Sequence, residues 1–454
     1  MYRYLFVFMG LLIFSFSNAQ SKIPKKRKYG FTPKLVTGPY LQMPTSNSMT
    51  IRWRTADRDV SFVRYGKDEN HLDQLAGNSS RTSEHIVNLT GLEPGTQYYY
   101  LIEGVRDTLK WDSDTRFQTL PLFRKKEKVA VGLFGDAGNN SDNQRKVRDA
   151  FKAYTQDRNL NALIMLGDNA YSFGTDAEYQ QNFFDIYQDQ FLKNTPVFAI
   201  PGNHDYHDYV TFAEHAQQSG LLAYFDRFTM PTKGELGGVA SHTQSFYAFD
   251  LGNAHFIALD SYGLEDFKGT RVFDLDGRQA KWLIKDLEAN KTKKWKIVLI
   301  HHPPYSMGSH NSDTEAQLIK IRENLTPIFE KYGVDVVFSG HSHDYERSKL
   351  MKGHTGNNAS FHQGYFISQS SAKDNGTPNS APYDKRKSND GTVYVVAGSS
   401  GALDHQQKTY PHNAMPFSTN ELGGAALLEI EDSRLEMKWI NSEGKVWDNF
   451  VIIK

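Results

Sequence analysis

Residues 129–138 read VAVGLFGDAG, a short apolar run that ends in a glycine and an aspartate. A second stretch, ALIMLGDNAY at 162–171, repeats this form after an amphipathic segment. Short apolar runs bounded by turn residues are typical of strands buried on both faces. Strands that alternate with helical stretches indicate layers of helix and sheet. We therefore predict an α/β domain over residues 128–454.

The same alternation continues toward the C-terminus. Further apolar runs are found at 196–200, 254–259, 296–300, 335–338 and 393–397. Amphipathic stretches, which predict helices, are found at 143–156, 177–191, 277–290 and 314–332. Residues 423–453 return to alternating strand character and are expected to complete the edge of the sheet. In such sheets, ligands gather at the carboxyl ends of the strands.

A different pattern occupies residues 32–120. Short alternating strands such as MTIRWR at 49–54 and QYYYLI at 97–102 are separated by turn residues, which predicts an all-β sandwich. The segment LEPGTQY at 92–98 resembles the tyrosine corner of a fibronectin type III domain, with Trp53 as the central core aromatic. Because no group of metal ligands or nucleophiles is found there, we expect a structural or docking domain.

Composition and the N-terminus limit the function classes. The 454 residues include 52 Lys plus Arg and 52 Asp plus Glu, so no net charge favours nucleic acid or an anionic membrane as a partner. Residues 1–19 have a basic start, an apolar run at 5–16 and a small-residue cleavage site, which predicts a signal peptide. The run is too short to span a bilayer. We expect an exported protein, periplasmic, cell-surface or extracellular, without stable membrane insertion.

Polar residues follow five of the apolar runs, each where a strand gives way to a loop. The segments are Gly135-Asp136-Ala137-Gly138, Gly167-Asp168-Asn169-Ala170-Tyr171, Gly202-Asn203-His204-Asp205, Ile300-His301-His302 and Gly340-His341-Ser342-His343. The first three are separated by about one βαβ unit each. Their side chains can therefore converge at one end of the sheet.

The converging residues form a mixed set of oxygen and nitrogen ligands without a thiolate. Such a set suits iron, zinc or manganese rather than calcium. Seven candidate ligands are too many for one tetrahedral ion, whereas two ions bridged by one carboxylate fit the number. A single Gly-Asp after a strand is commonly only a turn, but five such segments in this order predict a dinuclear metal centre.

These segments resemble the calcineurin-like metallophosphoesterases, and specifically the purple acid phosphatases. That family's pattern GDxG, GDxxY, GNH[DE], VxxH and GHxH is complete here, and Tyr171 is the residue that separates this family from most of its superfamily. The resemblance implies a four-layer αββα sandwich, preceded by an all-β fibronectin type III-like sandwich similar to the accessory domain of the longer, plant-type members.

The resemblance also implies the metals and their ligands. The Fe(III) site would be made by Asp136, Tyr171, His343 and the bridging Asp168. The second site, for divalent Zn, Fe or Mn, would be made by Asp168, Asn203, His301 and His341. Two further histidines, His204 and His310, are similar to the substrate histidines of the family, and Asn203 also lies on the substrate side.

We therefore expect a secreted acid phosphatase that hydrolyses small phosphomonoesters by attack of a metal-bound hydroxide, with His204 and His310 as catalytic residues. A phosphodiesterase or nucleotide pyrophosphatase on the same metals is one alternative. The other is a surface adhesion or glycan-binding protein with a vestigial phosphatase domain, against which the intact ligand set argues. The stretch HPPY at 302–305 and the polar segment 351–391 depart from the family and leave substrate preference open.

Overall fold

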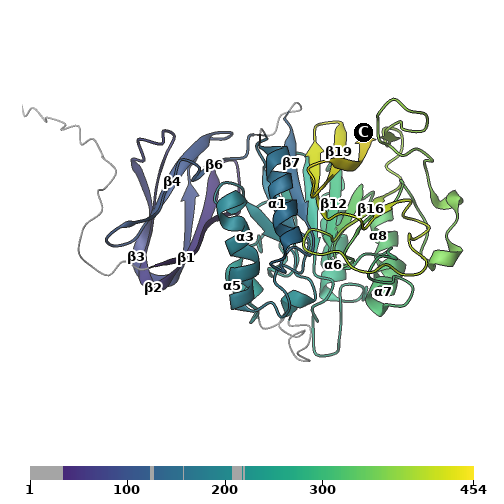
Figure 1. Cartoon of the computed structure of the whole chain (residues 1–454), viewed down its shortest axis with the longest axis horizontal. Coiled ribbons are helices and arrows are strands. Elements are labelled where there is room, and N and C mark those ends of the chain that lie inside the picture. Colours follow the sequence, from purple (N-terminus) through teal and green to yellow (C-terminus); the bar gives the residue numbers. More distant parts are fainter. Residues whose placement is uncertain (1–33, 123–126, 157, 207–216, 218–219) are drawn as a thin grey trace, which may run out of the picture.

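The computed structural model describes residues 34–122, 127–156, 158–206, 217 and 220–454. The predicted signal peptide at 1–19 lies outside the described residues. The described strands form one six-stranded sheet and two seven-stranded sheets. Figure 1 shows the six-stranded part beside the larger body that contains the other two sheets and most of the helices.

The N-terminal part is an all-β sandwich, as predicted. Its strands are β1 (Leu35–Gln42), β2 (Ser48–Gly66), β3 (Gln74–Thr90), β4 (Gln97–Glu103), β5 (Thr108–Lys110) and β6 (Arg116–Gln118). The first half of the long β2 pairs with β1 and its second half pairs with β4, while β3 follows β2 along its length. One hydrogen-bonded sheet therefore supplies both layers, and Trp53 is fully buried between them, in the position expected for it.

His85 of β3 is buried beside Trp53. The two rings stack with their centroids 4.7 Å apart, and the ring nitrogens of His85 lie 2.8 Å from the hydroxyl oxygens of Thr55 and Ser61. Burial lowers the pKa of His85 to about 4, although the carboxylate of Asp59 opposes this shift. The folded sandwich therefore favours the neutral ring.

We expect the sandwich to lose stability in acid because of His85. Its folded pKa lies below the unfolded value of 6.5, so the stabilisation is complete above pH 6.5 and disappears as the pH falls toward 4. The loss amounts to roughly 3 kcal/mol. Hydrogen exchange of the β2 amides in the wild type and in His85→Gln measures it. The stability difference between the two proteins should shrink with falling pH, and a constant difference would contradict the role of His85.

The larger body contains two sheets that face each other. One has the order β10-β11-β12-β13-β16-β14-β17 and the other β15-β20-β19-β18-β7-β8-β9. In chain order, the first seven of these strands are β7 (Val129–Phe134), β8 (Ala162–Met165), β9 (Val197–Ala199), β10 (Tyr247–Leu251), β11 (Ala254–Leu259), β12 (Trp295–Ile300) and β13 (Val336–Ser339). The other seven are β14 (Tyr345–Arg347), β15 (Tyr383–Asp384), β16 (Val393–Ala397), β17 (Phe417–Thr419), β18 (Gly424–Ile430), β19 (Arg434–Asn441) and β20 (Val446–Ile453).

Helices cover the outer faces of both sheets. The longer helices are α1 (Asp142–Thr155), α6 (Arg278–Ala289), α7 (Ala316–Asn324) and α8 (Thr326–Lys331). A Cβ on Gly132 of β7 would lie 2.9 Å from Phe151 of α1, so this face of β7 is closed by the helix. On β12, Ile297 and Leu299 join the core between the sheets, whereas Val298 and Ile300 pack with α6, α7 and α8. The predicted four-layer αββα order is confirmed.

Two elements differ from the sequence prediction. The C-terminal strand β18 pairs with β7 in the interior of its sheet, so residues 423–453 form a large part of that sheet rather than its edge. The predicted helix at 177–191 is a run of short pieces with π-helical turns. These pieces are α2 (Asp176–Glu178), Tyr179–Phe184, α3 (Asp185–Tyr187) and Gln188–Leu192. Of the described helices, none has both the length and the apolar character needed to cross a membrane.

The sandwich packs directly on the larger body. The hydroxyl of Tyr40 donates to the carbonyl of Arg227 at the end of α5 (Ala223–Arg227), at 2.7 Å, and the hydroxyl of Tyr100 donates to the carbonyl of Lys193, also at 2.7 Å. The ring of Tyr40 also contacts Phe184, and Tyr40 belongs to the core of the larger body. The sandwich is therefore a supporting element of that body.

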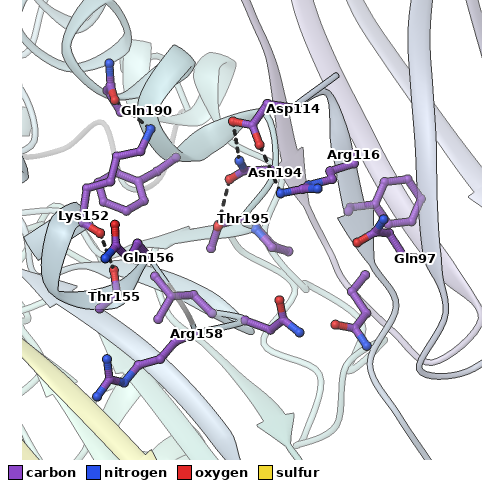
Figure 2. Close-up of a pocket in the computed structure, with 16 residues that line it drawn as sticks. Gln97, Asp114, Arg116, Lys152, Thr155, Gln156, Arg158, Gln190, Asn194 and Thr195 are labelled. Carbon is purple, nitrogen blue, oxygen red and sulfur yellow. Dashed lines mark hydrogen bonds and ion pairs between the residues drawn. The ribbon is translucent and has the colours of Figure 1, made fainter. Parts of the chain in front are cut away.

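A polar pocket of about 230 Å³ lies at this junction (Figure 2). Asp114 of the sandwich accepts a hydrogen bond from Asn194 of the larger body at 3.1 Å, and Lys152 donates to Gln190 at 2.8 Å. These four polar side chains in the wall of the pocket are therefore hydrogen-bonded in pairs. None of the predicted site residues lines this pocket, so the candidate site lies elsewhere.

Candidate metal centre

The predicted site residues lie at the carboxyl ends of five parallel strands, where the two sheets meet. Asp136, Asp168 and Asn203 follow β7, β8 and β9 of one sheet, and His301 and His341 follow β12 and β13 of the other. Asp136, Asp168 and His341 have φ values of 56°, 52° and 67°, in the left-handed region that side chains rarely adopt. Such strained positions are concentrated at functional sites.

The glycines that precede these residues leave room for them. A Cβ on Gly202 would lie 2.1 Å from Oδ1 of Asp168, and a Cβ on Gly340 would lie 2.4 Å from Oδ2 of Asp136. Contacts of this length are impossible for a side chain with a Cβ. The close approach of the loops, and therefore of their side chains, depends on glycine at both places.

Asp168, His301 and His341 form one group. Their ligand atoms all lie within 4.8 Å of one another, and Nε2 of His301 is 3.4 Å from Oδ2 of Asp168. Nδ1 of His301 donates to the carbonyl of Leu166 at 2.8 Å, which turns Nε2 toward the carboxylates. Burial opposes protonation of His301, but the carboxylates of Asp168 and Asp136 raise its pKa to about 9. The group therefore attracts positive charge.

Tyr171, Asp136 and His343 form a second group beside the first. The hydroxyl of Tyr171 donates to Oδ1 of Asp136 at 3.1 Å and lies 3.1 Å from Nε2 of His343. Burial and the carboxylate of Asp136 raise the pKa of Tyr171 well above its ordinary value. A phenolate at this position thus requires a cation next to it.

Asn203 and His204 lie next to Asp168. The backbone amide of His204 donates to Oδ1 of Asp168 at 2.9 Å, and its Nδ1 donates to the carbonyl of Ser172 at 2.8 Å. The ring of His204 contacts that of Tyr171, with centroids 4.4 Å apart. His310 stacks on His341 at 3.6 Å. The structure therefore brings all nine predicted site residues into one region.

The side chains present fit a pair of cations. Nε2 of His301 and Oδ1 of Asn203 are buried and have no hydrogen-bond partner among the described residues. Buried polar atoms in folded proteins are normally paired. Nε2 of His301 lies beside the carboxylate of Asp168, and both unpaired atoms are of a kind that ligates metals, so a bound cation would satisfy them.

Two contacts of the site were not predicted from the sequence. Nδ1 of His343 donates to Asp404 at 2.5 Å, and Nδ1 of His310 donates to Glu315 at 2.9 Å. Burial opposes ionisation of Glu315, but hydrogen bonds from His310 and His341 hold its pKa well below the usual range. Asp404 is 61 residues from its partner, so no local pattern marks it. Of the two contacts, only that between His310 and Glu315 could have been anticipated from the sequence, because these residues are five positions apart.

Comparison with known proteins identifies a class of metal-dependent enzymes, in agreement with the geometry of the site. A model of the calcineurin-like phosphoesterases matches residues 129–345, and a model of the purple acid phosphatase N-terminal domain matches residues 37–119. The chain is 26% identical to purple acid phosphatase 23 of Arabidopsis thaliana over 389 residues, which cover 73% of this chain and 78% of that protein. It is 25% identical to human acid phosphatase type 7 over 441 residues, covering 90% and 88%.

A solved structure shows the same fold. The purple acid phosphatase from yellow lupin (Lupinus luteus) seeds superposes with a TM-score of 0.68 at 20% identity, covering 93% of this chain and 74% of that one. Two facing sheets with a polar cluster at their strand ends define a calcineurin-like metallophosphoesterase. The N-terminal sandwich narrows the class further, and the chain belongs to the purple acid phosphatases. It is thus an acid phosphatase of a family that uses two metal ions.

Proposed function

We propose that this enzyme hydrolyses small phosphomonoesters with Fe(III) and one divalent ion, Zn, Fe or Mn. We assign the Fe(III) site to Asp136, Tyr171, His343 and Asp168. We assign the divalent site to Asp168, Asn203, His301 and His341. The observation that carries this proposal is the hydroxyl of Tyr171, which lies between Asp136 and His343 within 3.1 Å of both.

The protein's own side chains orient the substrate and supply the proton for the leaving oxygen. Two such ions, when bound, supply Lewis acidity toward the phosphate oxygens and an activated water. His204 is held at Nδ1 by the carbonyl of Ser172, which leaves Nε2 for a phosphate oxygen. His310 is held at Nδ1 by Glu315, which leaves Nε2 to protonate the leaving oxygen. Neither task requires a side-chain nucleophile.

A substrate panel tests the reaction class. We expect metal-replete protein to have a higher kcat/KM on a phosphomonoester than on a bis-ester or on ATP. A clear preference for the bis-ester would overturn the assignment to monoesters. Absence of hydrolysis of all three would favour a vestigial phosphatase domain.

Replacing Tyr171 with Phe is expected to abolish the visible absorption band of the iron-replete protein. A phenolate bound to Fe(III) gives ligand-to-metal charge transfer, whereas a phenyl ring cannot. The variant should also retain iron less well and be reduced more easily, because phenolate donation stabilises the oxidised ion. The ring contact with His204 is kept, so packing changes little. Tyr332→Phe, outside the site, serves as the control. A band that survives unchanged would remove Tyr171 from the iron site.

We also propose that the protein is exported, with a signal peptide at 1–19, a sandwich domain at 32–120 and a catalytic domain at 128–454. The sequence pattern of the first 19 residues supports export. The zero formal charge supports small molecules rather than nucleic acid as its partners.

A further inference from the structure

Glu315 contacts two histidines to which the proposed function gives different tasks. Its Oε2 atom accepts a hydrogen bond from Nδ1 of His310 at 2.9 Å and lies 3.4 Å from Nε2 of His341. The two histidine rings stack with their centroids 3.6 Å apart. One carboxylate oxygen thus serves both the proposed proton donor and a proposed ligand of the divalent ion.

The backbone holds this carboxylate in a defined position. Oε1 of Glu315 accepts from the amide of Asn311 at 2.7 Å, and Glu315 itself is the N-cap residue of α7, directly before Ala316. A carboxylate fixed at one oxygen and at its backbone presents the other oxygen at a defined point. The rings of His310 and His341 therefore take their orientation from Glu315.

The nitrogens that Glu315 engages determine which nitrogens remain for chemistry. Nδ1 of His310 carries the proton shared with Glu315, which leaves Nε2 for the substrate. Nε2 of His341 faces Glu315, which leaves Nδ1 for an ion shared with Asp168 and His301. A carboxylate behind a ligating histidine fixes the ring and makes the ligating nitrogen more basic.

We propose that Glu315 is a positioning residue that orients the proton donor His310 and the metal ligand His341 together. This inference rests on the proposed function. In the reaction, a water molecule releases one proton to solvent and its hydroxyl group bonds to phosphorus, and the bond to the leaving oxygen breaks with its electron pair staying on that oxygen. The proton on Nε2 of His310 passes to the leaving oxygen. His310 is left neutral, still donating through Nδ1 to Glu315, and regains a proton from solvent.

Dependence on the leaving group separates this role from a structural one. An alkoxide is a poor leaving group and needs the proton, whereas p-nitrophenolate leaves without it. We expect Glu315→Gln to lower kcat/KM for glycerol phosphate by about 10²-fold or more. For p-nitrophenyl phosphate the loss should stay below about tenfold. A general loss of structure would lower both values equally.

Metal binding provides the second readout. In metal-free protein carrying Glu315→Gln, the affinity for Zn²⁺, measured by competition with a chelator, should fall by about 10–100-fold. Glu323→Gln is the matched control, because Glu323 lies on the same helix in an exposed ion pair with Lys320. This control should keep the wild-type substrate ratio and Zn²⁺ affinity. Glu315→Asp, which keeps the charge but has a shorter side chain, should lie between the wild type and Glu315→Gln in both readouts.

A double variant tests whether the two residues act as one unit. His310→Asn should reproduce the selective loss on glycerol phosphate, and adding Glu315→Gln should not change the substrate ratio further. A wild-type substrate ratio in Glu315→Gln, or a change in only one of the two readouts, would overturn the shared role. If the metal-replete wild type hydrolysed neither ester, the proposed function itself would be wrong.

Discussion

Replacing Asp168 with Asn is expected to lower kcat/KM for phosphomonoesters by on the order of 10³-fold or more, because two metal ions contribute several kcal/mol to the transition state. Asp168 is the proposed bridge between the ions. It is buried, lies 3.4 Å from His301 and accepts the amide of His204 at 2.9 Å. The amide of Asn has the same shape but carries no charge to hold the cations together.

The content of both metals should fall with the activity of Asp168→Asn. Elemental analysis of purified protein, together with kcat/KM on one monoester, measures the two quantities. Asp189→Asn is the control, since Asp189 pairs with Lys110 at the surface and does not contact the site. A fully loaded Asp168→Asn protein with activity within about tenfold of the wild type would contradict a bridging role.

Replacing Arg347 with Met is expected to destabilise the fold by about 3–5 kcal/mol, the usual cost of breaking a buried ion pair. Arg347 of β14 donates to Asp448 of β20 through Nε at 2.5 Å and through Nη2 at 3.0 Å, and both residues are buried. This pair joins the two facing sheets, and β14 begins two residues after His343. Loss of the guanidinium leaves the buried carboxylate of Asp448 with Lys373, at 3.2 Å, and the hydroxyl of Tyr345, at 2.8 Å, as its remaining partners.

Denaturant unfolding of the metal-free protein measures this effect without a contribution from bound metal. Arg434→Met, which breaks an exposed pair with Asp374, should cost no more than about 1 kcal/mol. Adding Asp448→Leu to Arg347→Met should restore much of the stability, because the fully buried carboxylate is then removed as well and Lys373, its other charged partner, is partly exposed to solvent. If Arg347→Met unfolded at the wild-type denaturant concentration, the ion pair would not hold the sheets together.

Local sequence patterns were enough to predict most of the fold. The apolar runs at 129–134 and 296–300 became β7 and β12, because apolar residues on both faces of a strand can be satisfied only inside a layered structure. The order of strands within a sheet is not a local property. The place of β18 beside β7 depends on residues some 300 positions apart along the chain, as the register of Ala426 with Leu133 shows.

Local patterns in the amino-acid sequence were enough to show which chemical groups are available and at which strand ends they lie. Asp136, Tyr171 and His343 were identified because a short apolar run, a glycine and polar side chains follow one another within a few residues. Which nitrogen of each histidine is free to bind became clear only from the folded structure. That choice depends on Leu166, Glu315 and Asp404, which reach His301, His341 and His343 through folded loops. Hydrogen bonds between residues far apart in the chain exist only after packing has brought their atoms within about 3 Å.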